Sequence, residues 1–283
     1  MKTKGKNKPL RWWQYILLSI PCLIFLFPVF ILITRSFFSN SELTTIGAGL
    51  FSKNPTFNNY FEAFSNKELL NGLKNSLIIC ACNVIGAPLT AFMAAYAFTK
   101  VKFKGRKQMF MFGLGTVMIP GVLLQLPCYK IFVDLGWYDT LLPLTIPCFF
   151  GGGILNIFMI MQFIRSVPKE VYEAATLDGA NTLQKLFGIT LPIIKPIIVF
   201  MMVSAFFGAW TDLTGPLLYV QSQENYTITL YIYEAYLCVE EAEAMRPATQ
   251  MAIGVLLMIP MVLVYIRYQN ELINGLKFGA VKE

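Results

Sequence analysis

Long apolar stretches alternate with short charged segments along the chain. A helix needs about 20 apolar residues, rising 1.5 Å each, to cross roughly 30 Å of hydrocarbon. Five stretches without a charged residue meet this length: 15–34, 75–99, 108–129, 140–164 and 247–266. A sixth, at about 196–220, contains one charge, Asp212, and insertion scales put that cost at only about 2.5–3.5 kcal/mol. The pattern therefore predicts an all-α polytopic membrane protein with six transmembrane helices.

Positive charge is concentrated in alternate segments between these stretches. Most of the 23 Lys and Arg lie in the N-terminal tail, the second and fourth connections and the C-terminal tail. Because Lys and Arg accumulate in cytoplasmic loops, we expect both termini to be cytoplasmic. This gives a basic tail at 1–14, one membrane domain at 15–268 and a second tail at 269–283. The net charge of +7 then needs no nucleic-acid partner.

Composition excludes several classes of protein. Hydrophobic residues make up 56% of the chain and charged residues 14%, against roughly 25% charged residues in soluble domains. The mean hydropathy of +0.58 agrees with a membrane protein. The sequence has no histidine, which excludes His-based triads and His-ligated zinc or haem. No G-x-x-x-x-G-K-[ST] motif occurs, so we expect the chain to bind no nucleotide by itself.

Two outer connections, 35–74 and 221–246, are long. The second is acidic, with Glu224, Glu234, Glu240, Glu241 and Glu243. These loops are candidates for docking an extracytoplasmic partner, and from composition alone they are equally well explained as solvated caps.

The fourth connection, 166–196, is neither a short turn nor a span. Its good helix formers run up to Gly179, where the missing Cβ allows a sharp turn. Asn181 and Gln184 then resemble a capping box that restarts a helix, and we expect Pro192 to end it. The segment therefore predicts a rigid cytoplasmic helix-turn-helix. An amphipathic helix lying on the membrane is the alternative, which the acidic residues of the segment disfavour near an anionic leaflet.

The stretch EAATLDGA…FGITLPIIKP within this connection resembles the EAA motif of permease subunits of bacterial ABC importers. In that family the motif forms the coupling helix, which sits in a cleft of the ATP-hydrolysing subunit. The resemblance implies ATPase-coupling roles for six residues: Glu173, Ala174, Ala175, Asp178, Gly179 and Ala180.

Further matches point to the carbohydrate branch of that family, the maltose-type and multiple-sugar permeases. They are NPTFNNYFEAF, AAYAFTKVKFKGRK, MIPGVLLQLPCY and the tail QNELINGLKFGAVKE. The resemblance covers almost the whole chain from the first span onward. A fifth-span W-N-x-F-x-x-P pattern departs here, with Thr211 and Leu213 in place of Asn and Phe, so substrate contacts inherited at those two positions are not expected.

The resemblance also implies the partners. They are a second homologous permease subunit, an ATPase dimer that binds ATP and Mg and docks on the coupling helix, an extracytoplasmic solute-binding protein, a sugar or oligosaccharide, and membrane lipid. This chain would be a transport subunit in a bacterial cell membrane, with no catalytic residue, metal or cofactor of its own.

A sugar site needs amides or carboxylates together with an aromatic platform. The candidates for the substrate pathway are Asn83, Gln125, Asn156, Trp210, Asp212 and Gln250. For the amides, hydrogen bonding between helices is the stronger interpretation. For Asp212, near the outer interface, a solvated carboxylate is likewise a stronger interpretation than substrate contact.

Three other functions stay open at this point. A self-sufficient secondary transporter or channel would need ionisable residues at mid-membrane, and apart from Asp212 the spans have none. An intramembrane enzyme lacks G-x-S-x-G and H-E-x-x-H support. An importer of the same superfamily for peptides, amino acids or phosphate is disfavoured by the tail and third-span matches.

Overall fold

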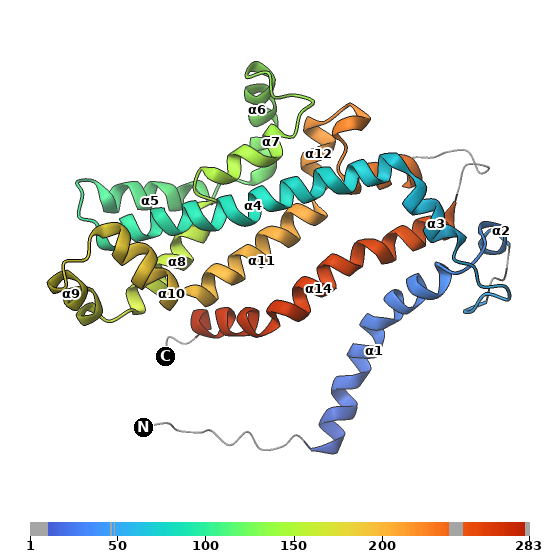
Figure 1. The fold of residues 1–283 in the computed structure, drawn as a ribbon, viewed down its shortest axis with the longest axis horizontal. Coiled ribbons are helices and arrows are strands. Elements are labelled where there is room, and N and C mark those ends of the chain that lie inside the picture. Colours follow the sequence, from blue (N-terminus) through green and yellow to red (C-terminus); the bar gives the residue numbers. More distant parts are fainter. Residues whose placement is uncertain (1–10, 46, 48, 238–245, 281–283) are drawn as a thin grey trace. The chain divides into compact units, whose positions relative to one another are not determined.

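The computed structural model describes residues 11–45, 47, 49–237 and 246–280 (Figure 1). All regular elements in this part of the chain are helical. In the first half they are α1 (Trp12–Arg35), α2 (Asn40–Leu43), α3 (Asn58–Ser65), α4 (Lys67–Lys100), α5 (Arg106–Thr116), α6 (Gly121–Asp134), α7 (Leu142–Thr145) and the 3-10 helix η1 (Ile146–Phe149). In the second half they are α8 (Ile154–Ser166), α9 (Lys169–Leu177), the π-helix η2 (Gln184–Thr190), α10 (Leu191–Ile193), α11 (Lys195–Thr211), α12 (Thr214–Tyr219), the 3-10 helix η3 (Gln223–Asn225), α13 (Ile228–Ile232), the π-helix η4 (Tyr233–Leu237) and α14 (Pro247–Ala280).

Four helical segments are long and apolar enough to cross a membrane. They are Trp12–Arg35, Lys67–Lys100, Leu142–Ser166 and Pro247–Ile273. Two more candidates are bent pairs, α5 with α6 at 101° and η2–α10 with α11 at 81°. The predicted all-α polytopic membrane fold is confirmed, and the number of spans in the described residues is six when each bent pair counts as one.

The stretch predicted as a single helix at 108–129 is divided. α5 ends at Thr116, and Pro120 precedes α6 with extended backbone angles of φ −57° and ψ 128°. Proline has no N–H to donate and disfavours helical geometry in the residue before it. The local sequence therefore accounts for the break between α5 and α6.

The stretch predicted at 196–220 also ends early. α11 ends at Thr211, and Asp212 has extended angles of φ −67° and ψ 122°. The Asp212 carboxylate accepts a hydrogen bond from the backbone N–H of Gly215 at 3.2 Å, a local bond of the kind that competes with helix continuation. The one charge assigned to this span thus lies beyond the end of its helix.

The chain forms two compact units, of which residues 67–237 belong to the larger. Its core lies where α8 and α11 both pack against α4 (Figure 1). Ala91 and Ala95 of α4, fully buried, bring the backbones close, and Phe92, Ile160 and Ile164 fill the space beside them. Small residues at helix interfaces are typical of membrane bundles, where packing replaces the hydrophobic effect.

The smaller unit contains residues up to Asn66 and the first part of α14. The buried Asn59 donates hydrogen bonds to the carbonyls of Ser36 and Phe38 at 2.8 and 2.7 Å. Glu62 pairs with Arg246 and accepts a hydrogen bond from the buried Thr249. None of the residues of α1 is buried, so its apolar surface is available to lipid or another subunit. Of the acidic loop, Glu240, Glu241 and Glu243 lie outside the described residues.

Candidate coupling segment and cavity

The predicted helix-turn-helix begins with α9 and turns at Gly179. Gly179 has φ +79°, a left-handed conformation that costs residues with a Cβ about 1–2 kcal/mol. The N–H of Ala180 donates to the carbonyl of Ala175 at 2.9 Å, and the N–H of Gly179 to that of Thr176 at 3.1 Å. These bonds are a Schellman motif, which fixes the turn rather than leaving it a loose loop.

The capping box predicted after the turn is confirmed. The backbone N–H of Asn181 donates to Gln184 Oε1 at 2.8 Å, and the N–H of Gln184 donates to Asn181 Oδ1 at 2.9 Å. The helix that follows is a π-helix, η2, and it continues into α10. The helix does not end at Pro192 itself but continues through Ile193. The chain bends at Ile194 instead.

The six residues of the EAA match do not share one face. Glu173, Ala174, Asp178 and Gly179 are exposed, whereas Ala175 is buried and Ala180 half-buried. A Cβ added at Gly179 would meet no atom within 4 Å. The exposed four therefore form an open surface, and Ala175 supports it from beneath. Leu177, which the sequence did not single out, is 89% exposed beside them, and its apolarity at the end of an exposed helix is the signal that could have found it.

A chain of side-chain contacts attaches α9 to the larger unit's core. Lys100 Nζ, at the end of α4, lies 3.6 Å from the centroid of the Tyr172 ring. The Tyr172 hydroxyl is 3.0 Å from Thr190 Oγ1, which donates to the carbonyl of Lys185 at 2.8 Å. Lys185 Nζ in turn donates to Thr176 Oγ1 of α9 at 2.8 Å. The contact between Lys100 and Tyr172 therefore joins α9 to the end of α4.

Removing that contact is expected to loosen α9. Lys100→Gln and Tyr172→Leu each abolish the cation–π interaction, worth about 1 kcal/mol in partly exposed sites, or roughly fivefold in an opening equilibrium. Hydrogen exchange of the α9 amides should accelerate by that factor. Lys100→Arg keeps a cation beside the ring and should preserve protection. Tyr172→Phe keeps the ring but loses the hydrogen bond to Thr190, so it reports the effect of that bond separately. Lys102→Gln removes an exposed charge two residues away and serves as the control; equal acceleration in this variant would contradict the role of the ring contact.

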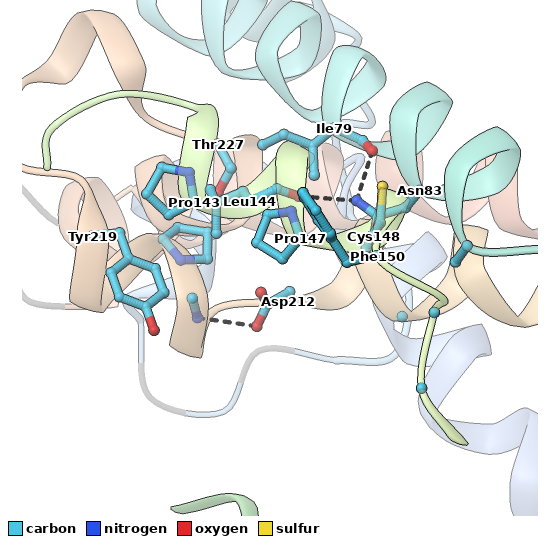
Figure 2. Close-up of a pocket in the computed structure, with 17 residues that line it drawn as sticks. Ile79, Asn83, Pro143, Leu144, Pro147, Cys148, Phe150, Asp212, Tyr219 and Thr227 are labelled. Atoms are coloured by element: carbon cyan, nitrogen blue, oxygen red, sulfur yellow. Dashed lines mark hydrogen bonds between the residues drawn. The ribbon is translucent and has the colours of Figure 1, made fainter. Parts of the chain in front are cut away.

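The larger unit also contains an open cavity of about 470 Å³ (Figure 2). Its walls come from α4, α7, η1, the loop before α8, the end of α11, α12 and the residue before α13. The lining residues are Ile79, Asn83, Ala87, Pro143, Leu144, Pro147, Cys148, Phe150, Gly152, Gly153, Gly208, Ala209, Asp212, Gly215, Pro216, Tyr219 and Thr227. Its volume lies within the range of roughly 300–1,000 Å³ usual for small-molecule sites.

Three consecutive glycines shape one wall of this cavity. Gly151, Gly152 and Gly153 have φ of +97°, +58° and +93°, so the stretch predicted as one helix at 140–164 is interrupted between η1 and α8. The N–H of Gly151 donates to Thr90 Oγ1 at 3.2 Å, which ties the loop to α4. Irregular backbone in a membrane segment occurs where it is packed in protein or lines a cavity, and this loop does both.

The structure brings two of the predicted pathway residues together, since Asn83 and Asp212 both line the cavity. The Asn83 amide donates to the carbonyls of Ile79 and Leu144 at 2.9 and 3.0 Å, so it also joins α4 to α7, as the stronger interpretation of the amides expected.

The other four candidates do not line the cavity. Asn156 donates a hydrogen bond to the carbonyl of Gly152 and so holds a residue of the cavity wall. Trp210 is buried and stacks on Phe206 with ring centroids 5.6 Å apart. Gln125 lies on α6, and Gln250 lies in the smaller unit.

Two aromatic residues at the cavity were missed by the sequence argument. Phe150, directly before the three glycines, is 83% exposed, and Tyr219 packs edge-on against Phe132 with ring centroids 5.1 Å apart. The signal for Phe150 was its position before a run of glycines inside an apolar stretch. Tyr219 had no comparable signal, because it reaches the cavity only when α12 turns back after Asp212.

A carboxylate outside the spans clamps two loops near α12. Asp139, with φ +56°, accepts hydrogen bonds through Oδ1 from the N–H groups of Gln221 and Ser222 at 2.9 and 2.8 Å. Its Oδ2 accepts from the Ser222 hydroxyl, and its carbonyl accepts from the Asn225 amide at 2.6 Å. The Ser222 hydrogen bonds are the main reason that the pKa of Asp139 falls to about 2.

Replacing this clamp is expected to loosen the loop at 220–225. Asp139→Ala removes the acceptors and places alanine at a positive φ, whereas Asp139→Asn keeps one acceptor oxygen and tolerates that φ. Because the native pKa is depressed, the carboxylate's stabilisation is full above its ordinary pKa of 3.8 and is lost as pH falls toward 2. Proteolysis of this loop should rise in the order wild type, Asn, Ala at pH 7. A wild-type loop equally resistant at pH 2.5 and pH 7 would contradict the clamp.

Comparison with known proteins gives a consistent result. The family model described as "Binding-protein-dependent transport system inner membrane component" matches residues 6–274. An inner membrane ABC transporter permease of Escherichia coli K12 is 27% identical over 270 residues, covering 95% of each chain. A galactooligosaccharide transport system permease of Bacillus subtilis is 28% identical over 274 residues, again covering 95% of each. Among solved structures, a bacterial ABC transporter that imports the acidic polysaccharide alginate matches with a TM-score of 0.81 and 22% identity, covering 91% of this chain and 94% of that one.

Proposed function

The chain belongs to the family of binding-protein-dependent transport system inner membrane components, and from this premise we propose that it is the permease subunit of an importer of sugars or oligosaccharides. Membership makes it a non-catalytic, multi-pass subunit of a binding-protein-dependent ABC importer. The sugar substrate is the finer step. The carbohydrate-branch sequence matches support it, as does a relative named for galactooligosaccharides.

Coupling is assigned to the exposed surface of α9. Nucleotide is handled by a separate ATPase in this family, so force must enter this chain through a contact with that subunit. The turn at Gly179 carries the proposal, because two backbone hydrogen bonds and a capping box hold an exposed, small-residue surface rigid. A rigid protrusion transmits displacement that a flexible loop would absorb. Glu173, Ala174, Asp178 and Gly179 would contact the ATPase, and Ala175 and Ala180 would hold them in place.

In the proposed cycle both termini and α9 are cytoplasmic, as the charge distribution favours. ATP closes the ATPase dimer, α9 moves with its docking cleft, and the contact between Tyr172 and Lys100 carries the movement to α4. ATP can drive this change only if it binds the closed dimer better than the open one. The solute-binding protein would deliver the sugar from the opposite side, with a second homologous permease completing the pathway.

Reconstitution of the assembled transporter in proteoliposomes tests this function. Uptake of the solute should require ATP, the ATPase and the solute-binding protein together. Omitting any one of the three should reduce uptake to the level of empty liposomes. Uptake driven by an ion gradient with this chain alone would instead identify a self-sufficient secondary transporter.

A further inference from the structure

We propose that the cavity beside Asp212 takes a neutral sugar unit and discriminates against anionic solutes, so that Asp212 determines the charge of the solute carried. The inference rests on the proposed function and adds the preferred charge of the solute, which similarity to known proteins does not determine. The similar proteins include one named for galactooligosaccharides and one importer of an acidic polysaccharide.

Two polar side chains that line the cavity, Asp212 and Asn83, can accept hydrogen bonds from a solute. Asp212 uses Oδ1 for the N–H of Gly215 at 3.2 Å, and a carboxylate has about four lone-pair sites, so it retains capacity for donors. Both hydrogens of the Asn83 amide go to the carbonyls of Ile79 and Leu144 (Figure 2). The oxygen of that amide is therefore what Asn83 can offer a solute. Sugar hydroxyls can donate hydrogen bonds to the side-chain oxygens of Asp212 and Asn83, whereas an ionised carboxylate or phosphate oxygen of a solute has no hydrogen to donate.

The charge around the cavity has one sign. Of the described residues that line it, Asp212 alone is charged. Three prolines, Pro143, Pro147 and Pro216, line the same cavity, and an apolar surrounding strengthens interactions between charges. An anionic solute in this cavity would meet an uncompensated carboxylate with no Lys or Arg among the lining residues.

The remaining lining fits a sugar ring. Phe150 presents an 83% exposed side chain to the cavity, and Tyr219 lines it as well (Figure 2). Binding sites commonly combine apolar and aromatic walls with a few placed polar groups. Here the aromatic rings can cover the apolar face of a pyranose while the two oxygens receive its hydroxyls. A neutral ring that carries hydroxyl donors therefore matches the two acceptors and the apolar walls of the cavity.

The test uses pairs of sugars that differ only in charge. Saturation-transfer NMR, which suits weak binding, compares glucose with glucuronate and galactose with galacturonate. The sample is the full transporter purified through a tag on this chain and held in nanodiscs. We expect the neutral member of each pair to bind at least about tenfold more tightly, which corresponds to about 1.4 kcal/mol. In Asp212→Asn and Asp212→Ser this ratio should fall to roughly twofold, because both side chains keep an acceptor for Gly215 but carry no charge.

Asp134→Asn is the matched control. Asp134 is an exposed carboxylate of the same unit that pairs with Lys130 and does not line the cavity, so this variant should leave the ratio unchanged. Equal or tighter binding of the uronates by the wild type, no saturation transfer to either sugar, or equal shifts in the Asp212 and Asp134 variants would each overturn the inference. The ratio of the two affinities measured for the wild type tests the inference even if an Asp212 variant fails to assemble. ATP-dependent uptake of an acidic solute would defeat this inference while leaving the importer function intact.

Discussion

Gly179→Asp should lower solute uptake by the assembled transporter by at least about tenfold without preventing membrane insertion. The new side chain would stand at φ +79° and would place a second carboxylate next to Asp178 on the surface proposed to contact the ATPase. Substitution of a hot-spot residue at the centre of an interface costs about 2 kcal/mol or more, which is more than tenfold in affinity. ATP hydrolysis should persist while transport is lost, since the ATPase itself is unchanged.

Gly105→Asp separates the interface from the backbone effect. Gly105 has φ +81° and, like Gly179, no atom within 4 Å of an added Cβ, so it pays the same conformational cost in a different loop. We expect this variant to keep uptake within about twofold of wild type, since that cost alone is about 1–2 kcal/mol of local stability. Glu173→Lys, which reverses an exposed charge on the same surface, should resemble Gly179→Asp. The ratio of solute moved to ATP hydrolysed in proteoliposomes measures the coupling directly. Normal ratios in both α9 variants would remove α9 as the transmission point.

The elements that the sequence predicted well are those set by local chemistry. The apolar stretches located the membrane segments, because length and absence of charge mark a segment that can cross the bilayer, but they did not show where three of these segments are interrupted. Gly179, Asn181 and Gln184 predicted the turn and its capping box because each bond closes within a few residues. The EAA match located α9 but could not separate exposed Glu173 from buried Ala175, since that distinction depends on what packs behind the helix.

The features that were missed depend on partners distant in the sequence. Lys100 meets Tyr172, and Asp139 binds Ser222 across 83 positions; neither pairing has a periodic signature. The breaks at Pro120 and Asp212 have local causes, a proline and a side chain that bonds to nearby backbone, but a long apolar stretch alone predicts a continuous helix through both positions. The break at Asp212 and the glycine loop before α8 both line the cavity. In straight, continuous helices this backbone would lie inside a helix instead of along the cavity wall.

Gly152→Ala should be the most destabilising single-methyl change in the larger unit. A Cβ at this position would lie 2.7 Å from the carbonyl oxygen and 2.9 Å from the Cα of Ala87. These are backbone atoms of α4 that cannot rotate away. Overpacking of this kind typically costs about 1–3 kcal/mol, in addition to about 1–2 kcal/mol for a left-handed residue with a Cβ. The glycine loop would have to withdraw from α4, and the cavity wall that it forms would move with it.

Gly136→Ala isolates the conformational part of that cost. Gly136 has φ +71° and no atom within 4 Å of an added Cβ. Gly136→Ala should therefore lose only the stability that a left-handed residue with a Cβ costs, about 1–2 kcal/mol. The difference in thermal stability between the two purified variants, followed by fluorescence-detected size-exclusion chromatography, then reports the contact with Ala87 alone. Equal losses would mean that the loop yields freely, and a wall that yields freely could not hold Phe150 and Asp212 in a fixed relation. A larger loss at Gly152 would show that the close approach to α4 leaves the glycine loop no room to shift, so that this wall of the cavity is held in place.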